Sequence, residues 1–151
     1  HRLKLSNIEA NTLKTMILWH LRPGYLADNE ILTTRAVFRF FRDTNTEALS
    51  VLLLSLADQR ATRGRLTTTG SRLRHERLVS KLLKEYFRRK KEKKMPRLIN
   101  GYDLMKRFKL EPSPLIGKIL SEIEELQAIG KIKTKPEALK SAAKFLKIKA
   151  Q

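Results

Sequence analysis

Hydrophobic side chains recur at helical intervals along almost the whole chain, and no segment shows the strict alternation that is typical of a strand. Ser6-Asn7-Ile8-Glu9 has the spacing of a capping box, and Leu13, Met16 and His20 follow at roughly helical intervals. Leu21-Arg22-Pro23-Gly24 is expected to end this helix, because proline cannot continue a helix and glycine readily takes the turn. The pattern predicts an all-α protein.

Two further helices are predicted before residue 65. The first begins after Thr33 or Thr34 and runs through Phe41. The second begins near Thr46, whose hydroxyl is expected to cap it. It continues through a leucine-rich stretch to Gly64, which is expected to stop it in a left-handed conformation.

The longest predicted helix, residues 71–94, is amphipathic. Its apolar face consists of Leu73, Leu78, Val79, Leu82, Leu83, Tyr86 and Phe87. Basic side chains lie largely opposite, at Arg74, Arg77, Lys81, Lys84, Arg88 and Lys91. We interpret the aromatic pair Tyr86 and Phe87 as part of the core rather than as a surface on which nucleic-acid bases stack.

Met95-Pro96 breaks the long helix. The pattern then predicts helices at residues 100–108, at residues 113–129 with Gly130 as the stop, and from Pro136 onward. We place a domain boundary near residues 92–97. It divides the chain into a first helical domain, residues 1–94, and a small helical tail, residues 95–151.

The composition fits a packed, soluble protein. The 151 residues are 41% hydrophobic with few glycines and prolines, which favours a core over disorder. No apolar run approaches the roughly 20 residues of a membrane span, so no membrane partner is expected. Cysteine is absent, which excludes disulfides and thiolate metal sites and is compatible with the cytoplasmic location that we expect.

Charge changes the picture most. The chain holds 33 basic and 15 acidic residues, and their distribution is uneven. Residues 72–94 hold 11 basic and 3 acidic residues, residues 95–130 hold 5 of each, and residues 131–151 hold 7 and 1. Two basic segments around a neutral one indicate an extended site for a polyanion, for which nucleic acid is the usual partner. A solvated basic surface is the alternative.

Catalytic and metal-binding patterns are weak. His1, His20 and His75 show no paired ligand spacing, and His75, beside two arginines, is expected to have an ordinary role at the surface. The chain has no nucleophile elbow and no glycine-rich nucleotide loop. Asp58 lies inside an apolar helix, where a carboxylate needs a partner. A buried ion pair with neighbours such as Arg60 or Arg63 and a functional carboxylate both remain open.

The segment Leu110-Glu-Pro-Ser-Pro-Leu-Ile-Gly-Lys-Ile-Leu120 places glycine in a helix start, at a cost of about 1 kcal/mol relative to alanine. In one interpretation Ser113 caps the helix, and the free N–H groups of Leu115, Ile116 and Gly117 bind a phosphate. In the other, Gly117 lets the preceding helix pack closely. The two are compatible.

Four stretches in order resemble the C-terminal part of the bacterial tRNA nucleotidyltransferase and poly(A) polymerase family, which includes the CCA-adding enzymes. They are His20-Leu-Arg-Pro-Gly-Tyr-Leu-Ala-Asp28, Thr34-Arg-Ala-Val-Phe-Arg-Phe-Phe-Arg-Asp-Thr44, Leu53-Leu-Ser-Leu-Ala-Asp-Gln-Arg-Ala-Thr-Arg-Gly64, and Ile99-Asn-Gly-Tyr-Asp-Leu-Met105 with Leu110-Glu-Pro-Ser-Pro-Leu-Ile-Gly117 and Ala128-Ile-Gly-Lys-Ile132. The resemblance covers nearly the whole chain. Pro112-Ser113-Pro114 replaces the Pro-Gly-Pro that is common in the family.

The resemblance implies that the first three stretches are the later half of an HD-like helical domain and that the fourth is a tail engaging the body of tRNA. Asp58 falls where HD domains place their last metal-binding aspartate, but the earlier His-Asp ligands do not occur here. The family's catalytic head, with its Gly-Ser and paired aspartates, is also missing. We therefore expect a chain that begins partway through a domain, with no catalytic or metal site of its own. Mg²⁺ and nucleotide are expected to belong to the absent head.

The function predicted from the sequence is to bind tRNA or another structured RNA and to position it for 3′-end nucleotide addition by the catalytic head domain. A metal-dependent HD-type phosphohydrolase domain is the alternative. The residues expected to contact nucleic acid are Arg74, Arg77, Lys81, Lys84, Arg88, Arg89, Lys90, Lys91, Lys93, Lys94, Gly117, Lys118, Lys131 and Lys133.

Overall fold

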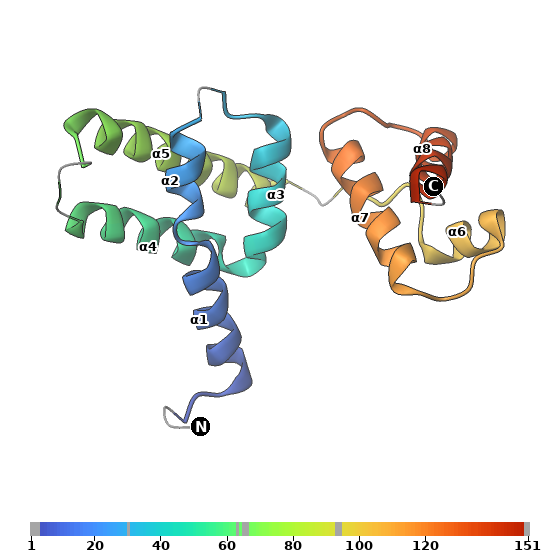
Figure 1. The fold of residues 1–151 in the computed structure, drawn as a ribbon, viewed down its shortest axis with the longest axis horizontal. Coiled ribbons are helices and arrows are strands. Elements are labelled where there is room, and N and C mark those ends of the chain that lie inside the picture. Colours follow the sequence, from blue (N-terminus) through green and yellow to red (C-terminus); the bar gives the residue numbers. More distant parts are fainter. Residues whose placement is uncertain (1–3, 30, 63, 65–66, 93–94, 150–151) are drawn as a thin grey trace. The chain divides into compact units, whose positions relative to one another are not determined.

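The computed structural model describes residues 4–29, 31–62, 64, 67–92 and 95–149, and these residues form helices joined by short loops, with no strand among them (Figure 1). The predicted all-α class is confirmed. The chain divides into two compact units, His1–Lys93 and Lys94–Gln151. Each unit has its own hydrophobic core.

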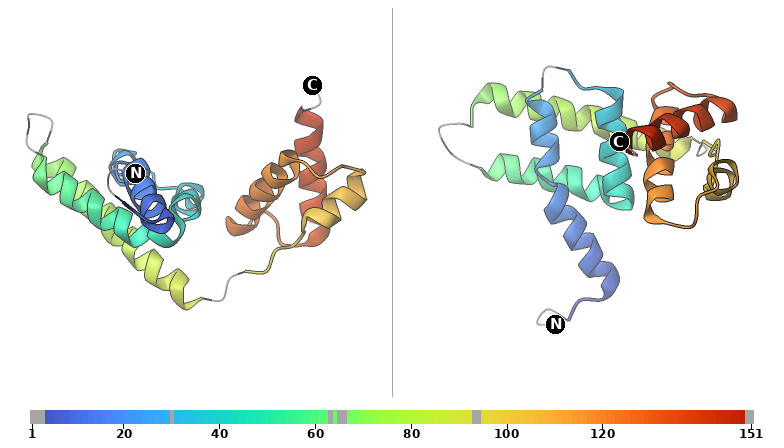
Figure 2. Two further views of the ribbon diagram at one scale, coloured as in Figure 1. Left: turned by 90° about the horizontal axis from the view of Figure 1, so that it is seen from below. Right: turned by 45° about the vertical axis from the view of Figure 1, so that its right-hand side comes forward.

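The first unit is a bundle around two long helices. Its elements are α1 (Asn7–Trp19), α2 (Arg22–Ala27), α3 (Thr34–Thr44), the 3₁₀ turn η1 (Asn45–Glu47), α4 (Ala48–Ala61) and α5 (Thr69–Lys91). Helices α4 and α5 lie side by side, and α2 packs against both (Figures 1 and 2). The buried core consists of Phe40, Ala48, Val51, Leu52, Leu78, Val79 and Leu82. It is closed by apolar side chains from every helix of the unit.

Polar residues start the predicted helices in several places. Ser6 and Glu9 form the predicted capping box at α1: the Glu9 N–H donates to Ser6 Oγ at 3.3 Å, and the Ser6 N–H donates to Glu9 Oε2 at 2.8 Å. Thr33 Oγ1 accepts from the Ala36 N–H at 3.1 Å and caps α3. Thr68 Oγ1 accepts from the Ser71 N–H at 3.1 Å and caps α5. This helix begins at Thr69, two residues before the predicted start at residue 71.

Three local predictions are wrong. Helix α1 ends at Trp19, just before the predicted stop, but Pro23 and Gly24 do not form the predicted turn. They lie in the first turn of α2, where the missing N–H of proline leaves no hydrogen bond unmade. Thr46 does not cap α4, because its hydroxyl donates to Glu47 Oε1 at 3.3 Å instead. Helix α4 ends at Ala61, before Gly64, and Gly64 is not among the residues with positive φ.

The second unit consists of α6 (Gly101–Phe108), α7 (Pro114–Ala128) and α8 (Lys135–Lys149). Its core is Ile99, Leu104, Ile116, Ile119, Ile123, Ile132, Ala138 and Ala142. Asn100 and Asp103 form a capping box at α6. Gly130 follows the end of α7 with φ 75°, which confirms the predicted stop. Gln127 Nε2 donates to the Pro96 carbonyl at 2.8 Å, which fixes the segment before α6 against α7.

Helix α1 buries none of its residues fully. Ile8 is 80% exposed, Ile17 68% and Leu18 63%, and apolar side chains of α1 line a shallow hollow on its surface together with Lys14. This helix therefore carries an uncovered apolar face. No helix in the described part of the chain is long and apolar enough to cross a membrane.

Candidate nucleic-acid interface

Helix α5 separates a buried face from a basic one. His75, Leu78, Val79 and Leu82 are buried against the rest of the unit. The opposite side, here called the outer basic face, consists of Arg74, Arg77, Lys81, Lys84, Arg88 and Lys91, all of them exposed. Steps of three and four residues keep these six side chains on one side of the helix. The structure thus brings together six of the residues that the sequence assigned to nucleic-acid binding.

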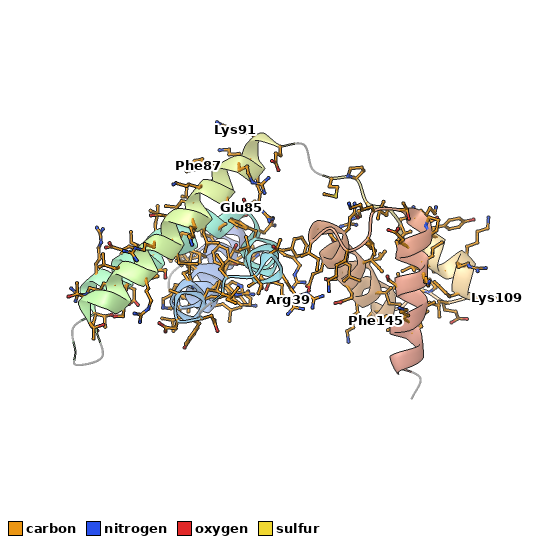
Figure 3. The ribbon with its side chains drawn as sticks, turned by 90° about the horizontal axis from the view of Figure 1, so that it is seen from above. Arg39, Glu85, Phe87, Lys91, Lys109 and Phe145 are labelled. Carbon is orange, nitrogen blue, oxygen red and sulfur yellow. The ribbon has the colours of Figure 1, made fainter. Side chains whose placement is uncertain are left out.

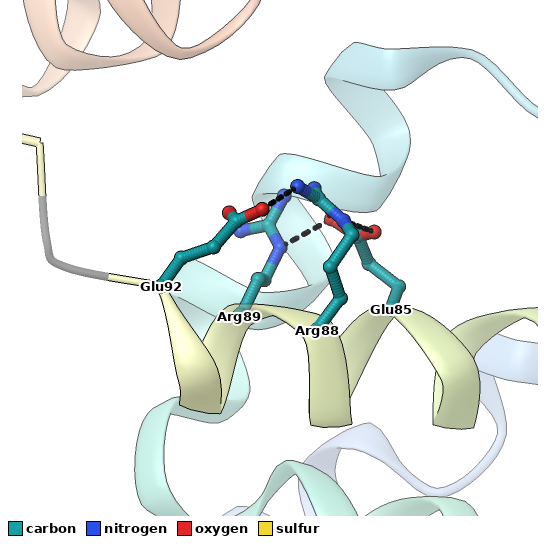
Figure 4. A network of polar contacts seen from close by, with 4 residues as sticks. All are labelled: Glu85, Arg88, Arg89 and Glu92. Atoms are coloured by element: carbon teal, nitrogen blue, oxygen red, sulfur yellow. Dashed lines mark hydrogen bonds and ion pairs between the residues drawn. The ribbon is translucent and has the colours of Figure 1, made fainter.

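Two glutamates hold the arginines near the end of α5 (Figure 4). Arg88 Nη2 donates to Glu85 Oε1 at 2.7 Å, and Arg88 Nη1 bonds to Glu92. Arg89 Nε donates to the same Glu85 oxygen at 2.6 Å. These bonds, first from Arg88 and then from Arg89, lower the pKa of Glu85, and the two carboxylates raise that of Arg88. Both arginines therefore have partners within the helix before any ligand arrives.

Arg89 differs from the outer basic face because it turns toward the core. Its guanidinium carbon lies 4.7 Å from the ring centroid of Phe41 in α3, a cation–π contact. This contact gives Arg89 a role in packing α5 against α3. Lys90 is exposed, whereas Lys93 and Lys94 lie outside the described residues.

The other members of the outer basic face have few neighbouring carboxylates. Arg74 Nη2 lies 4.0 Å from Asp28 Oδ1, at the outer limit of an ion pair. Arg77, Lys81 and Lys84 form no ion pair or hydrogen bond with another residue that the structure describes. Their charges are available to an incoming anion.

The predicted core role of Phe87 is wrong. Tyr86 packs against the core, but Phe87 is 52% exposed, and so is Leu73 at 45%. At about 100° per residue, Phe87 projects from the side of α5 away from the buried Leu78 and Leu82, outside the arc that the other helices cover. The covered face of α5 is narrower than the apolar stripe in the sequence. The sequence signal for this was the spacing of Phe87 from Lys84 and Lys91, three and four residues away, which places it on the basic side.

The second unit offers a sparser set of cations. Lys118, Lys131 and Lys133 are exposed. The Lys133 N–H donates to Glu137 Oε2 at 2.7 Å, and this bond contributes most to the lowered pKa of the Glu137 carboxylate. Glu137 thus places a negative charge at the start of α8, next to Lys133.

The structure bears on both interpretations of Gly117, close helix packing and phosphate binding. A Cβ at Gly117 would meet no atom within 4 Å, so close helix packing does not require this glycine; Gly101, whose Cβ would lie 3.5 Å from Ile116 Cγ2, is the closely packed one. Ser113 does not cap α7 through its side chain, and the Ile116 N–H is already bonded to the Ser113 carbonyl at 3.1 Å. One of the three predicted donors is therefore occupied. Gly117 itself is exposed.

Asp58 is exposed, so the interpretation as a buried ion pair is wrong. Arg60 pairs with Glu76 of α5 instead, at 3.2 Å, and Arg63 lies outside the described residues. Within the ranges that the structure describes, no three His, Cys, Asp or Glu side chains are grouped so that they could hold a metal ion.

The prediction that His75 lies at the surface is wrong. This residue of α5 is only 5% exposed and faces α4. Its Nε2 lies 3.0 Å from Ser55 Oγ, whereas Nδ1 is buried without a hydrogen-bond partner among the described residues. Burial lowers the pKa of His75 despite the opposing charges of Asp28, Glu76 and Asp58. Helix α4 provides the partner through Ser55, twenty residues away in the sequence, so local spacing gave no sign of it.

These observations define the class first: an all-α protein of two small helical units, one of which carries a long helix with a strongly basic outer face. The family follows from comparison. The model of a putative second domain of tRNA nucleotidyltransferases matches residues 2–143, and the chain belongs to this family. The resemblance drawn from the sequence is thereby confirmed. No curated protein and no solved structure matches the chain.

Proposed function

We propose that this chain is the RNA-binding helical region of a tRNA nucleotidyltransferase-like protein. In this proposal the outer basic face of α5 holds tRNA so that its 3′ end reaches a catalytic head domain elsewhere in the protein. Six exposed cations on one side of one helix carry the proposal, together with the family to which the chain belongs.

The physical chemistry of the face suits structured RNA. Lysine and arginine bind phosphates and release counterions without reading sequence. Double-stranded RNA is recognised mainly through its backbone and 2′-hydroxyls, since its deep major groove is closed to side chains. A rigid helix with cations spaced along one side therefore fits a regular row of phosphates better than it fits a small molecule.

Chemistry at the 3′ end is assigned to other parts of the protein. Nucleotidyl transfer needs metal ions held by carboxylates. The described residues contain no group of three or more His, Cys, Asp or Glu side chains that could hold such an ion. We propose, on the family resemblance, that Mg²⁺ and nucleotide bind the head domain.

Filter binding of folded tRNA across a salt series tests the RNA-binding proposal. We expect affinity to fall steeply as salt rises. The variant Arg77→Gln/Lys81→Gln should lower the log–log salt slope by about 1.4 to 1.8, since each phosphate contact contributes about 0.7 to 0.9. The matched control Lys14→Gln/Lys106→Gln removes two exposed lysines from other helices and should have a smaller effect. Binding that does not depend on salt would refute the proposal.

A further inference from the structure

Phe87 is a large aromatic side chain on the most basic helix of the protein, and about half of it faces solvent. It projects from the side of α5 opposite to Glu85, away from the helices that pack on α5 (Figure 3). The other aromatic residue here, Tyr86, holds it in place: the two rings meet edge to face, with centroids 5.2 Å apart. Phe87 is therefore exposed but not loose.

Two lysines flank Phe87 along the helix. Lys84 precedes it by three residues and Lys91 follows it by four, so the three side chains lie on one line of the helix surface. The lysine Cα atoms are about 10 Å apart along the axis, from a rise of 1.5 Å per residue. Both lysines are exposed, and neither forms an ion pair with another residue in the described ranges.

The glutamates near Phe87 do not neutralise this line. Glu85 is occupied by Arg88 and Arg89, and Glu92 by Arg88. The result is an apolar, planar ring between two available positive charges. An unpaired nucleotide offers the complementary arrangement, an aromatic base with a phosphate on either side. An acyl chain or an apolar protein side chain would match the ring but not the two charges.

We propose that Phe87 is a stacking platform for an unpaired base of bound RNA, with Lys84 and Lys91 contacting the phosphates on either side of that nucleotide. The proposal rests on the RNA binding proposed above and narrows it to RNA with an unpaired segment next to a duplex. Aromatic stacking accepts any base, so the site would add affinity without reading sequence.

The test uses the full chain and two RNAs: a blunt hairpin, and the same hairpin with a short unpaired 3′ tail that carries 2-aminopurine. Phe87→Ala should weaken binding of the tailed hairpin by about tenfold, which is typical of the loss of one stacked base, and should leave the blunt hairpin unchanged. Leu73→Ala is the matched control, because Leu73 is also an exposed apolar residue of α5 but has no aromatic face. It should change neither affinity.

Fluorescence gives a readout that does not depend on a variant. Stacking should quench 2-aminopurine when the wild-type chain binds the tailed hairpin, and Phe87→Trp should retain both the quenching and the affinity. Unquenched tail fluorescence in the wild-type complex, or equal losses for the two RNAs in Phe87→Ala, would overturn the stacking site while leaving RNA binding intact. If the wild-type chain binds neither RNA, the proposed function fails with it.

Discussion

Helices α5 and α8 are both rich in lysine, yet they use charge and burial differently. Helix α5 buries branched side chains, including Leu82, and a histidine, and it presents both arginine and lysine outward. Helix α8 packs through Ala138 and Ala142, which are fully buried, and exposes lysines without an exposed aromatic residue among its described side chains. The two helices have a similar density of charge in the sequence. Of the two, α5 alone combines exposed cations with carboxylates held in ion pairs and an exposed aromatic ring.

The difference shows that counting basic residues overestimates available charge. On α5 the glutamates engage Arg88 and Arg89, so the lysines and Arg77 are the residues left for a ligand. On the second unit Lys135 Nζ bonds to Asp103 Oδ1 at 2.6 Å, tying α8 to α6 and lowering the pKa of Asp103. A positive charge that is held in an ion pair stabilises the fold and is less available to a ligand.

The largest expected effect concerns the core beneath α5. Leu82 is 1% exposed, and Leu82→Ala should destabilise the first unit by about 2–5 kcal/mol, through lost apolar burial and the cavity left behind. Thermal unfolding followed by circular dichroism measures it. The exposed Leu73→Ala on the same helix is the control and should unfold close to the wild type. Equal losses for the two variants would mean that α5 does not bury the face described above.

A second prediction is that the stability of the first unit, which contains α5, depends on pH, whereas that of the second unit, which contains α8, does not. The folded-state pKa of His75 lies below that of an unfolded histidine, because burial disfavours its charged form. Its contribution to stability is therefore complete above about pH 6.5, the ordinary histidine pKa, and is lost as the pH falls toward the folded-state pKa. Urea unfolding between pH 8 and pH 5 should show this loss in the first unit.

The control for the pH effect is His75→Gln, which keeps a polar group near Ser55 but does not titrate. Its stability should change less than that of the wild type over the same pH range. The second unit buries alanines in α8 and should keep its stability there. A wild-type profile that stays flat through pH 6 would contradict the role given to His75.

A third prediction compares the two basic surfaces directly. Lys84→Gln/Lys91→Gln on α5 should reduce the salt slope of tRNA binding by about 1.4 to 1.8, because each phosphate contact contributes about 0.7 to 0.9. Lys140→Gln/Lys144→Gln removes the same charge from exposed positions of α8 and should reduce it less. If the α8 pair has the larger effect, the second unit holds the main interface.

The smallest expected effect is an increase in RNA affinity. Glu85→Gln removes the carboxylate that Arg88 and Arg89 share, and it raises the net charge by one. We expect RNA affinity to increase a few-fold at low salt and the gain to fade at high salt, because the added attraction is screened. Glu76→Gln, which changes charge elsewhere on α5, is the matched control. A loss of affinity in Glu85→Gln would show that RNA binding needs the arginines in their paired positions.

Much of the fold could be predicted because its signals are local. A capping box needs residues three apart, so Ser6 with Glu9 was visible in the sequence. The stop at Gly130 follows from the freedom of glycine to adopt positive φ. The errors at Pro23 and Thr46 also have local causes: each residue type suits two roles, and neighbouring hydrogen bonds decide between them.

The sequence by itself determined the helical periodicity and the basic side of α5, since both depend on residue types at short spacing. It also indicated the family, through four stretches in order along the chain. Tertiary structure decided how wide the buried face of α5 is, because that depends on where α2 and α4 pack against it. It therefore placed Phe87 in solvent and His75 in the interior, against both predictions. Periodicity fixes the direction of a side chain from its helix, but only the neighbouring helices determine whether that direction leads to the core or to water.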